Sequence, residues 1–96
     1  DEVTILETNS ENASKKFQDN YFDYIYIDGE HSYNAVYQDL TYWYPKLKSN
    51  GTIFGDDFYW REKDNSFSVK KAYEEFIAKQ KIKKWCVFKS QISIIK

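Results

Sequence analysis

The sequence has 96 residues, a net charge of −1 and one cysteine, Cys86. This length suits one small domain with a single core, and the low net charge provides no long-range attraction for nucleic acid. No apolar run approaches the roughly 20 residues of a membrane span, and no signal peptide opens the chain. A lone cysteine excludes a disulfide framework and indicates a reducing compartment. We therefore expect a cytoplasmic protein that binds neither nucleic acid nor membrane.

The first part of the chain is predicted to alternate strands and helices. A short apolar, partly β-branched run predicts a strand over about residues 3–7, and a weak helix over about 11–18 follows it, capped by Asn9 or Ser10. Residues 22–28 form a nearly continuous apolar run that ends in an acid. Such a run is typical of a strand buried on both faces of a parallel sheet.

The clearest helix is predicted between Tyr33 and Leu47, because apolar side chains recur there with helical spacing. Ser32 is the natural N-cap of this helix. Pro45 would cost a helix interior about 3 kcal/mol, so the last turn should loosen near Tyr44. Asp39 falls outside the apolar stripe and is expected on the polar side.

The remaining elements are expected in this order: a stop at 49–51, a buried strand over 52–54, an active-site flap over 58–67, a helix over about 69–77 capped by Ser68, and a hairpin of strands 85–88 and 91–95. Lys79 to Lys84 is the most basic patch, and we interpret it as a solvated helix end and loop. The alternation of elements predicts one α/β domain of three layers, with a mainly parallel sheet and an antiparallel C-terminal strand pair.

Three aspartates follow two predicted strands. Asp28 ends the strand over 22–28, and Asp56 and Asp57 end the next strand. Sequential parallel strands joined by one crossover lie about 4.8 Å apart, so these acids share one sheet edge. Three carboxylates without a soft ligand suit Mg²⁺ or another hard divalent cation. Side chains alternate along a strand, so Asp57 joins the group only if the strand has ended by Asp56.

Each of these features also has a purely structural interpretation. An aspartate at a strand end is often a turn or cap residue. His31 is either a locally hydrogen-bonded residue at a helix start or a proton acceptor beside a ligand. Tyr59 and Trp60 can belong to the core, to a lid over a planar substrate, or to both.

Several segments together resemble the later half of class I S-adenosylmethionine-dependent methyltransferases, and within them the macrocin O-methyltransferase-like subgroup. The segments are Ile27-Asp28-Gly29-Glu30-His31-Ser32-Tyr33, then Asp39-Leu40 with Trp43-x-Pro45-x-Leu47, and then Gly51-x-Ile53-x-Gly55-Asp56-Asp57. The resemblance covers roughly residues 5 to 80 and implies a Rossmann-like fold. It also implies S-adenosylmethionine and Mg²⁺ as cofactors and a small-molecule hydroxyl as acceptor.

The resemblance assigns roles to individual residues. It implies that Asp28, Asp56 and Asp57 bind Mg²⁺ and that Asp28 or His31 accepts the substrate proton. It implies that Ser10 and Glu11 border the adenine of the methyl donor, so that they and Asp28 form the cofactor-binding set. A metal-bound hydroxyl has a lowered pKa, which suits attack on the donor's methyl group.

The family's opening units have no counterpart here, because the three glycines, Gly29, Gly51 and Gly55, form no Gly-x-Gly loop. By resemblance the strand over 3–7 is the family's third strand. The chain then re-pairs this strand beside the one over 22–28, exchanges elements with another copy, or is a fragment of a longer protein. A second copy or a missing N-terminal half is therefore an expected partner.

Three functions remain open from the sequence. The leading one is the metal- and substrate-side half of an O-methyltransferase. The second is a non-catalytic remnant that acts as a binding or interaction module, which the missing Gly-rich loop favours. The third is a Mg²⁺-dependent phosphate-processing enzyme, although the chain carries neither a nucleophile motif nor a phosphate loop.

Overall fold

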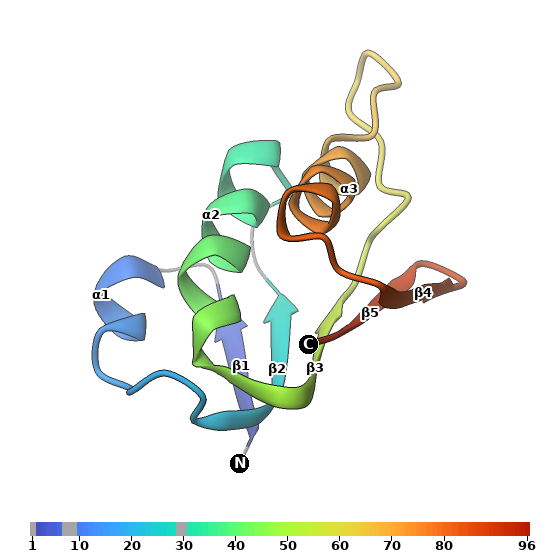
Figure 1. The fold of residues 1–96 in the computed structure, drawn as a ribbon. Helices are drawn as coiled ribbons and strands as arrows, with labels where there is room; N and C mark the ends of the chain where they lie inside the picture. Colours follow the sequence, from blue (N-terminus) through green and yellow to red (C-terminus); the bar gives the residue numbers. More distant parts are fainter. Residues whose placement is uncertain (1, 7–9, 29–30) are drawn as a thin grey trace.

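The computed structural model describes the backbone of residues 2–6, 10–28 and 31–96. It describes the side chains of residues 11–28 and 31–96. Its strands form one sheet in the order β1-β2-β3-β5-β4 (Figure 1). The elements are β1 (Glu2–Leu6), α1 (Ser10–Ser14), β2 (Phe22–Asp28), α2 (Tyr33–Trp43), a 3₁₀ turn (Tyr44–Lys46), β3 (Leu47–Gly55), α3 (Ser68–Gln80), β4 (Lys84–Phe88) and β5 (Gln91–Ile95). Strands β1, β2 and β3 are parallel, and β5 and β4 continue the sheet in antiparallel pairing. The expected α/β class, with its antiparallel C-terminal pair, is confirmed.

The described helices cover one face of this sheet. Strands β1, β2 and β3 follow one another in the same direction across the sheet, and right-handed crossovers place the connecting helices on the same side. Helix α2 packs between α1 and α3 in a single layer (Figure 1). The core lies between this layer and the sheet and consists of Phe22, Ile25, Ile27, Val36, Leu40, Trp43, Leu47, Ile53, Phe58, Val69, Ala72, Tyr73, Phe76, Ile77, Ile92 and Ile94.

The opposite face of the sheet is open in the described part of the chain. Tyr24 of β2 is 49% exposed and stacks on Phe54 of β3, with 6.2 Å between ring centroids. Ile95 of β5 lies across from Thr52 on the same face and is also exposed. Of the three layers expected, the described residues therefore supply two, the sheet and one helical layer. Of the three arrangements left open for the first strand, the structure has the direct pairing of β1 with β2.

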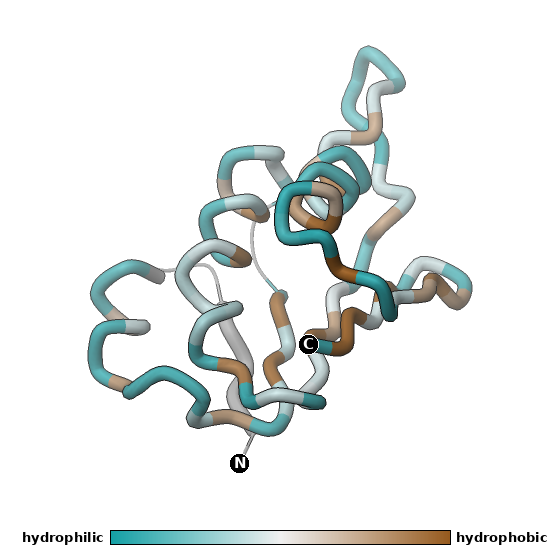
Figure 2. The backbone as a smooth tube through the Cα atoms, viewed as in Figure 1, coloured by the Kyte–Doolittle hydropathy of each residue, from teal (hydrophilic) through white to brown (hydrophobic). Residues whose placement is uncertain are grey.

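Helix α2 forms where the sequence predicts it. The Ser32 side chain accepts a hydrogen bond from Ala35 N at 3.1 Å, which confirms the expected N-cap. The helix gives way to a 3₁₀ turn at Tyr44, and Pro45 lies inside that turn as expected. Asp39 is only 8% exposed, contrary to the expectation of a polar side, because α1 and α3 cover both flanks of α2. Figure 2 shows the hydrophobic segments concentrated in the strands and on the inner side of the helices.

Three local predictions were wrong. Helix α1 ends at Ser14 rather than near residue 18, since it has few apolar residues to bury. Residues 49–51 lie within β3 instead of ending the preceding element, and the Asn50 N–H donates to the Lys96 carbonyl at 2.9 Å. Ser68 does not cap α3, because Phe67 occupies the cap position and makes no side-chain cap bond. Within the described ranges, no helix has the length and apolar content that crossing a bilayer demands.

Candidate functional site

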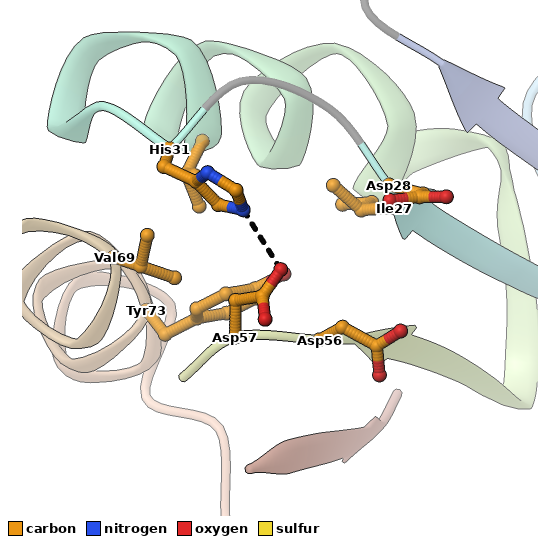
Figure 3. A pocket seen from close by; sticks show the side chains of 8 residues that line it. Ile27, Asp28, His31, Asp56, Asp57, Val69 and Tyr73 are labelled. Atoms are coloured by element: carbon orange, nitrogen blue, oxygen red, sulfur yellow. Dashed lines mark hydrogen bonds and ion pairs between the residues drawn. The ribbon is translucent and has the colours of Figure 1, made fainter. Parts of the chain in front are cut away.

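A small pocket opens at the carboxyl ends of the two central parallel strands (Figure 3). We call it the acidic pocket; it is lined by Ile27, Asp28, His31, Val36, Asp56, Asp57, Val69 and Tyr73. Ile27 pairs with Gly55 across β2 and β3, so the acids that follow these two residues emerge at the same edge. The cavity volume is about 10 Å³, which is space for about one water molecule or ion. In open α/β sheets this edge is where ligands bind.

The four residues that the sequence predicted for this site all line the pocket, namely Asp28, His31, Asp56 and Asp57. Strand β3 ends at Gly55, so the condition for Asp57 to join Asp28 and Asp56 is met. Asp57 has a φ of 59°, a left-handed conformation that turns the chain away from the strand direction. The register of β2 and β3 therefore brings together residues that are 28 positions apart in the sequence.

His31 and Asp57 form a hydrogen bond across the pocket. His31 Nε2 lies 2.7 Å from Asp57 Oδ2, and the two side chains are 41% and 50% exposed. The indole ring of Trp60 stacks on the imidazole, with 4.8 Å between centroids and 17° between planes. Trp60 thus covers one face of the histidine and also packs against the core, and a lid over a substrate stays a prediction. Its neighbour Phe58 is buried in the core, so the connection over 58–67 is anchored at its start.

Asp56 faces a different set of partners. Its Oδ2 accepts a hydrogen bond from the Tyr26 hydroxyl, and its Oδ1 accepts one from Gln91 Nε2 at 3.3 Å. In Figure 3 the carboxylates of Asp28 and Asp56 point away from the pair formed by His31 and Asp57. No group of three or more metal-binding side chains converges anywhere in the described residues. The Mg²⁺ site therefore stays a prediction, supported by the type and position of its donors.

Tyr73 forms the floor of the pocket. The side chain is 1% exposed, and burial, reinforced by the charges of Asp39, Asp56 and Asp57, raises its pKa well above the usual value. The phenol is therefore neutral at physiological pH. A hydrogen-bonding group without a charge lies beneath a rim of carboxylates.

The predicted cofactor residues at the start of α1 are not part of this pocket. The Glu11 carboxylate pairs with Lys15 at 3.3 Å on the surface of α1. The side chain of Ser10 lies outside the described residues, as do Asn9 and Gly29. The adenine contacts that the resemblance implies for Ser10 and Glu11 stay predictions.

Sequence reasoning missed three residues that shape the site. Tyr26 and Gln91 hold Asp56, and Tyr73 supports the pocket from below. The sequence could have indicated Tyr26, because it precedes Asp28 by two residues and therefore lies on the same face of the strand. Gln91 and Tyr73 come from distant elements, and only the packing of α3 and β5 against β3 brings them here.

The chain is similar to one protein family and to several solved structures. The family described as a methyltransferase domain matches residues 1–58. No curated protein matches the chain.

Three solved structures illustrate the similarity in fold. The O-methyltransferase NovP is 22% identical, with a TM-score of 0.65 over 80% of this chain and 30% of its own. A protein from Corynebacterium glutamicum is 11% identical, with a TM-score of 0.71 over 93% of this chain and 45% of its own. The MycE methyltransferase of the mycinamycin biosynthetic pathway, solved with Mg, SAH and mycinamycin VI, is 15% identical, with a TM-score of 0.66 over 91% of this chain and 28% of its own. The chain thus spans less than half the length of each.

Proposed function

The chain belongs to the family described as a methyltransferase domain, and from that premise we propose its activity. We propose that it forms the metal- and substrate-side part of an O-methyltransferase, which transfers a methyl group from S-adenosylmethionine to a hydroxyl of a small molecule. The observation that carries the proposal is the acidic pocket, which three aspartates and His31 line at the carboxyl ends of β2 and β3. The name of NovP and the Mg and SAH in the MycE complex support the reaction and both cofactors.

The residues of the pocket fit Mg²⁺ by the chemistry of their donors. Asp28, Asp56 and Asp57 offer oxygen ligands only, which a hard cation prefers. Binding requires Asp56 to exchange its present partners, Tyr26 and Gln91, for the cation. When bound, Mg²⁺ would supply a Lewis acid that lowers the pKa of the substrate hydroxyl.

His31 is the proposed proton acceptor. The ionised carboxylate of Asp57 can only accept a hydrogen bond, so His31 Nε2 must be the donor in this pair. The lone pair of Nδ1 is then free to accept the hydroxyl proton of the substrate. When bound, S-adenosylmethionine would supply the methyl group, and Nδ1 would take the proton that the substrate hydroxyl loses. Asp57 stabilises the resulting imidazolium, and Trp60 excludes water from one face of the ring.

The methyl donor and the partner complete the proposal. Glu11 and Ser10 are proposed to contact the adenine, although Glu11 lies outside the lining of the acidic pocket.

Because the chain spans less than half of the solved structures that it resembles, we propose that a further methyltransferase segment or a second copy joins it in the active enzyme. The exposed Cys86 suits a reducing compartment, so we propose a cytoplasmic location.

The metal role is tested by paramagnetic broadening of backbone amide signals with Mn²⁺ as the probe. We expect signals near Asp28 and Asp56 to broaden selectively, and Mg²⁺ in excess to reverse the effect. Asp28→Asn and Asp56→Asn should each weaken binding at least about tenfold, since each removes a charged ligand. Asp19→Asn is the matched control, because Asp19 is a surface acid that pairs with Lys46. Equal broadening in all four proteins would refute the metal site.

The engaged carboxylates favour a second candidate function, a non-catalytic binding module. Asp56 and Asp57 already have protein partners, and the cavity has room for an ion but for no substrate. Calorimetry with S-adenosylmethionine separates the two functions. Donor binding that Glu11→Gln weakens supports the enzyme, whereas Mg²⁺ binding without donor binding, even with the partner segment present, supports the module.

A further inference from the structure

A second cavity lies at the opposite edge of the sheet from the acidic pocket. It has a volume of about 240 Å³ and is formed where α3 ends, β4 begins and β5 ends. We call it the lysine groove; it is lined by Tyr44, Gln80, Lys81, Ile82, Lys83, Lys84, Ile95 and Lys96. It is much roomier than the acidic pocket, and its walls combine four ammonium groups with an aromatic and two aliphatic side chains. The groove plays no part in the proposed methyl transfer.

The groove lies in a strongly basic part of the chain. Residues 76–96 contain six lysines and no acid, whereas residues 1–75 contain eight basic and fifteen acidic side chains. The net charge of −1 therefore divides into +6 and −7. This segregation brings four lysines around one groove in which no lining residue is acidic.

The lysines of the groove differ in their partners, and among them Lys96 interacts electrostatically with Asp19. Lys81, Lys83 and Lys84 form no ion pair among the described residues, unlike Lys15, Lys46, Lys48 and Lys71 elsewhere on the surface. Lys96 Nζ donates to the carbonyls of Leu47 at 2.7 Å and Tyr44 at 3.2 Å, and it lies 5.0 Å from the centre of the Tyr44 ring. Lys96 is thus a fixed charge in the wall, while the other three are free to reach a ligand.

Stabilisation of the α3 terminus explains only part of this cluster. Lysines near a helix C-terminus interact favourably with its partial negative charge, which accounts for Lys79 and Lys81. The last carbonyls of α3 are already satisfied, because the N–H groups of Lys81 and Ile82 donate to Ala78 and Ile77. Lys83 and Lys84 come after the helix, and the field of the terminus falls off within one turn. These charges need another explanation.

We propose that the lysine groove binds a phosphate-bearing anion. Lys81, Lys83 and Lys84 contact the phosphate oxygens, and the fixed ammonium of Lys96 lies at the inner wall. Tyr44, Ile82 and Ile95 contact an apolar portion of the ligand. The same chemistry is offered by a soluble phosphate ester and by the phosphomonoester headgroup of a lipid. The patch from Lys79 to Lys84 is the exposed helix end and loop that we expected, and the proposal gives it a ligand.

The test is an NMR titration of the 96-residue chain with inorganic pyrophosphate. We expect saturable amide shifts confined to Lys81, Lys83, Lys84 and Ile95, with a Kd below about 1 mM. Lys83→Gln combined with Lys84→Gln should weaken binding at least about tenfold. Lys15→Gln combined with Lys16→Gln is the matched control, since it removes the same charge from an adjacent, exposed lysine pair directly after α1. This control should bind pyrophosphate like the wild type.

Flotation with phosphatidylcholine vesicles, with and without phosphatidic acid, distinguishes the two sources. Recruitment that depends on phosphatidic acid and on Lys83 and Lys84 assigns the groove to a lipid headgroup. Pyrophosphate binding without such recruitment assigns it to a soluble ester. The absence of both, or equal loss in the two double variants, overturns the proposal, because a general charge effect would then be sufficient.

Discussion

Gly55 and Tyr73 meet beneath the acidic pocket, and their contact determines how closely α3 approaches the sheet. A Cβ atom at position 55 would lie 2.6 Å from Tyr73 Cζ, which is far inside van der Waals contact. The tyrosine ring is buried against the sheet and cannot move toward solvent. The missing side chain at Gly55 is thus what allows a neutral phenol to lie under Asp56 and Asp57.

Replacing Gly55 by Ala should destabilise the protein by about 1–3 kcal/mol, because the added methyl group overpacks a filled site. Urea unfolding followed by circular dichroism measures the loss. Tyr73→Leu removes the ring that the methyl group meets, so the two substitutions together should cost clearly less than the sum of the single effects. Strict additivity would show that the clash does not limit the packing of α3.

At the scale of elements, α2 and α3 begin in different ways. Ser32 caps α2 through its hydroxyl, which accepts from Ala35 N. Ser68 holds the corresponding place in the sequence pattern, yet its hydroxyl donates to the His31 carbonyl at 3.3 Å. Ser32 therefore accepts a hydrogen bond from a backbone N–H of its own helix, whereas Ser68 links the start of α3 to the segment that carries His31. The sequence pattern is the same, and tertiary contact decides between the two uses.

Ser32→Ala should cost about 1 kcal/mol of stability, because an N–H at the start of α2 loses its acceptor. Ser68→Ala should cost less, since a single long hydrogen bond between loops is lost and no helix cap is removed. Thermal unfolding of the two variants side by side measures the difference. A larger loss for Ser68→Ala would mean that its bond to the His31 carbonyl outweighs a helix cap.

The elements that the sequence predicted well are those with a strong local pattern. The spacing of apolar residues in α2, the apolar run of β2 and the two short strands of the hairpin all indicate the observed structure. Right-handed crossover predicts that β2 and β3 lie parallel and close together, which is why the acids at their ends could be expected at one edge of the sheet. The side-chain directions could not be expected, since Asp56 turns to Tyr26 and to Gln91, 35 residues further along. Likewise, residues 49–51 resemble a turn, but pairing with the C-terminal residue Lys96 keeps them in β3.

For the molecule as a whole, the open face of the sheet leaves apolar side chains exposed to solvent, which limits the stability of the chain alone. Parallel sheets are ordinarily covered on both faces, and here the described helices cover one. Tyr24 and Phe54 stack on each other at the centre of the open face, with Ile95 nearby. A stacked aromatic pair in water gains less than the same pair under a second layer. The face therefore marks where a further segment or a second copy would bury apolar area.

The chain alone should consequently associate in a concentration-dependent way and bind the dye 1-anilinonaphthalene-8-sulfonate in its folded state. Tyr24→Thr combined with Phe54→Thr should reduce both effects, since threonine keeps the strand preference and removes the aromatic surface. Trp85→Thr is the control, because Trp85 is 44% exposed and, through its pairing with Ile94, belongs to the other face of the sheet. Sedimentation velocity measures the association, and dye fluorescence measures the exposed surface. A monomer at every concentration, with dye binding unchanged by the Tyr24 and Phe54 substitutions, would mean that the sheet face is stable in water as it stands and that the chain needs no covering layer.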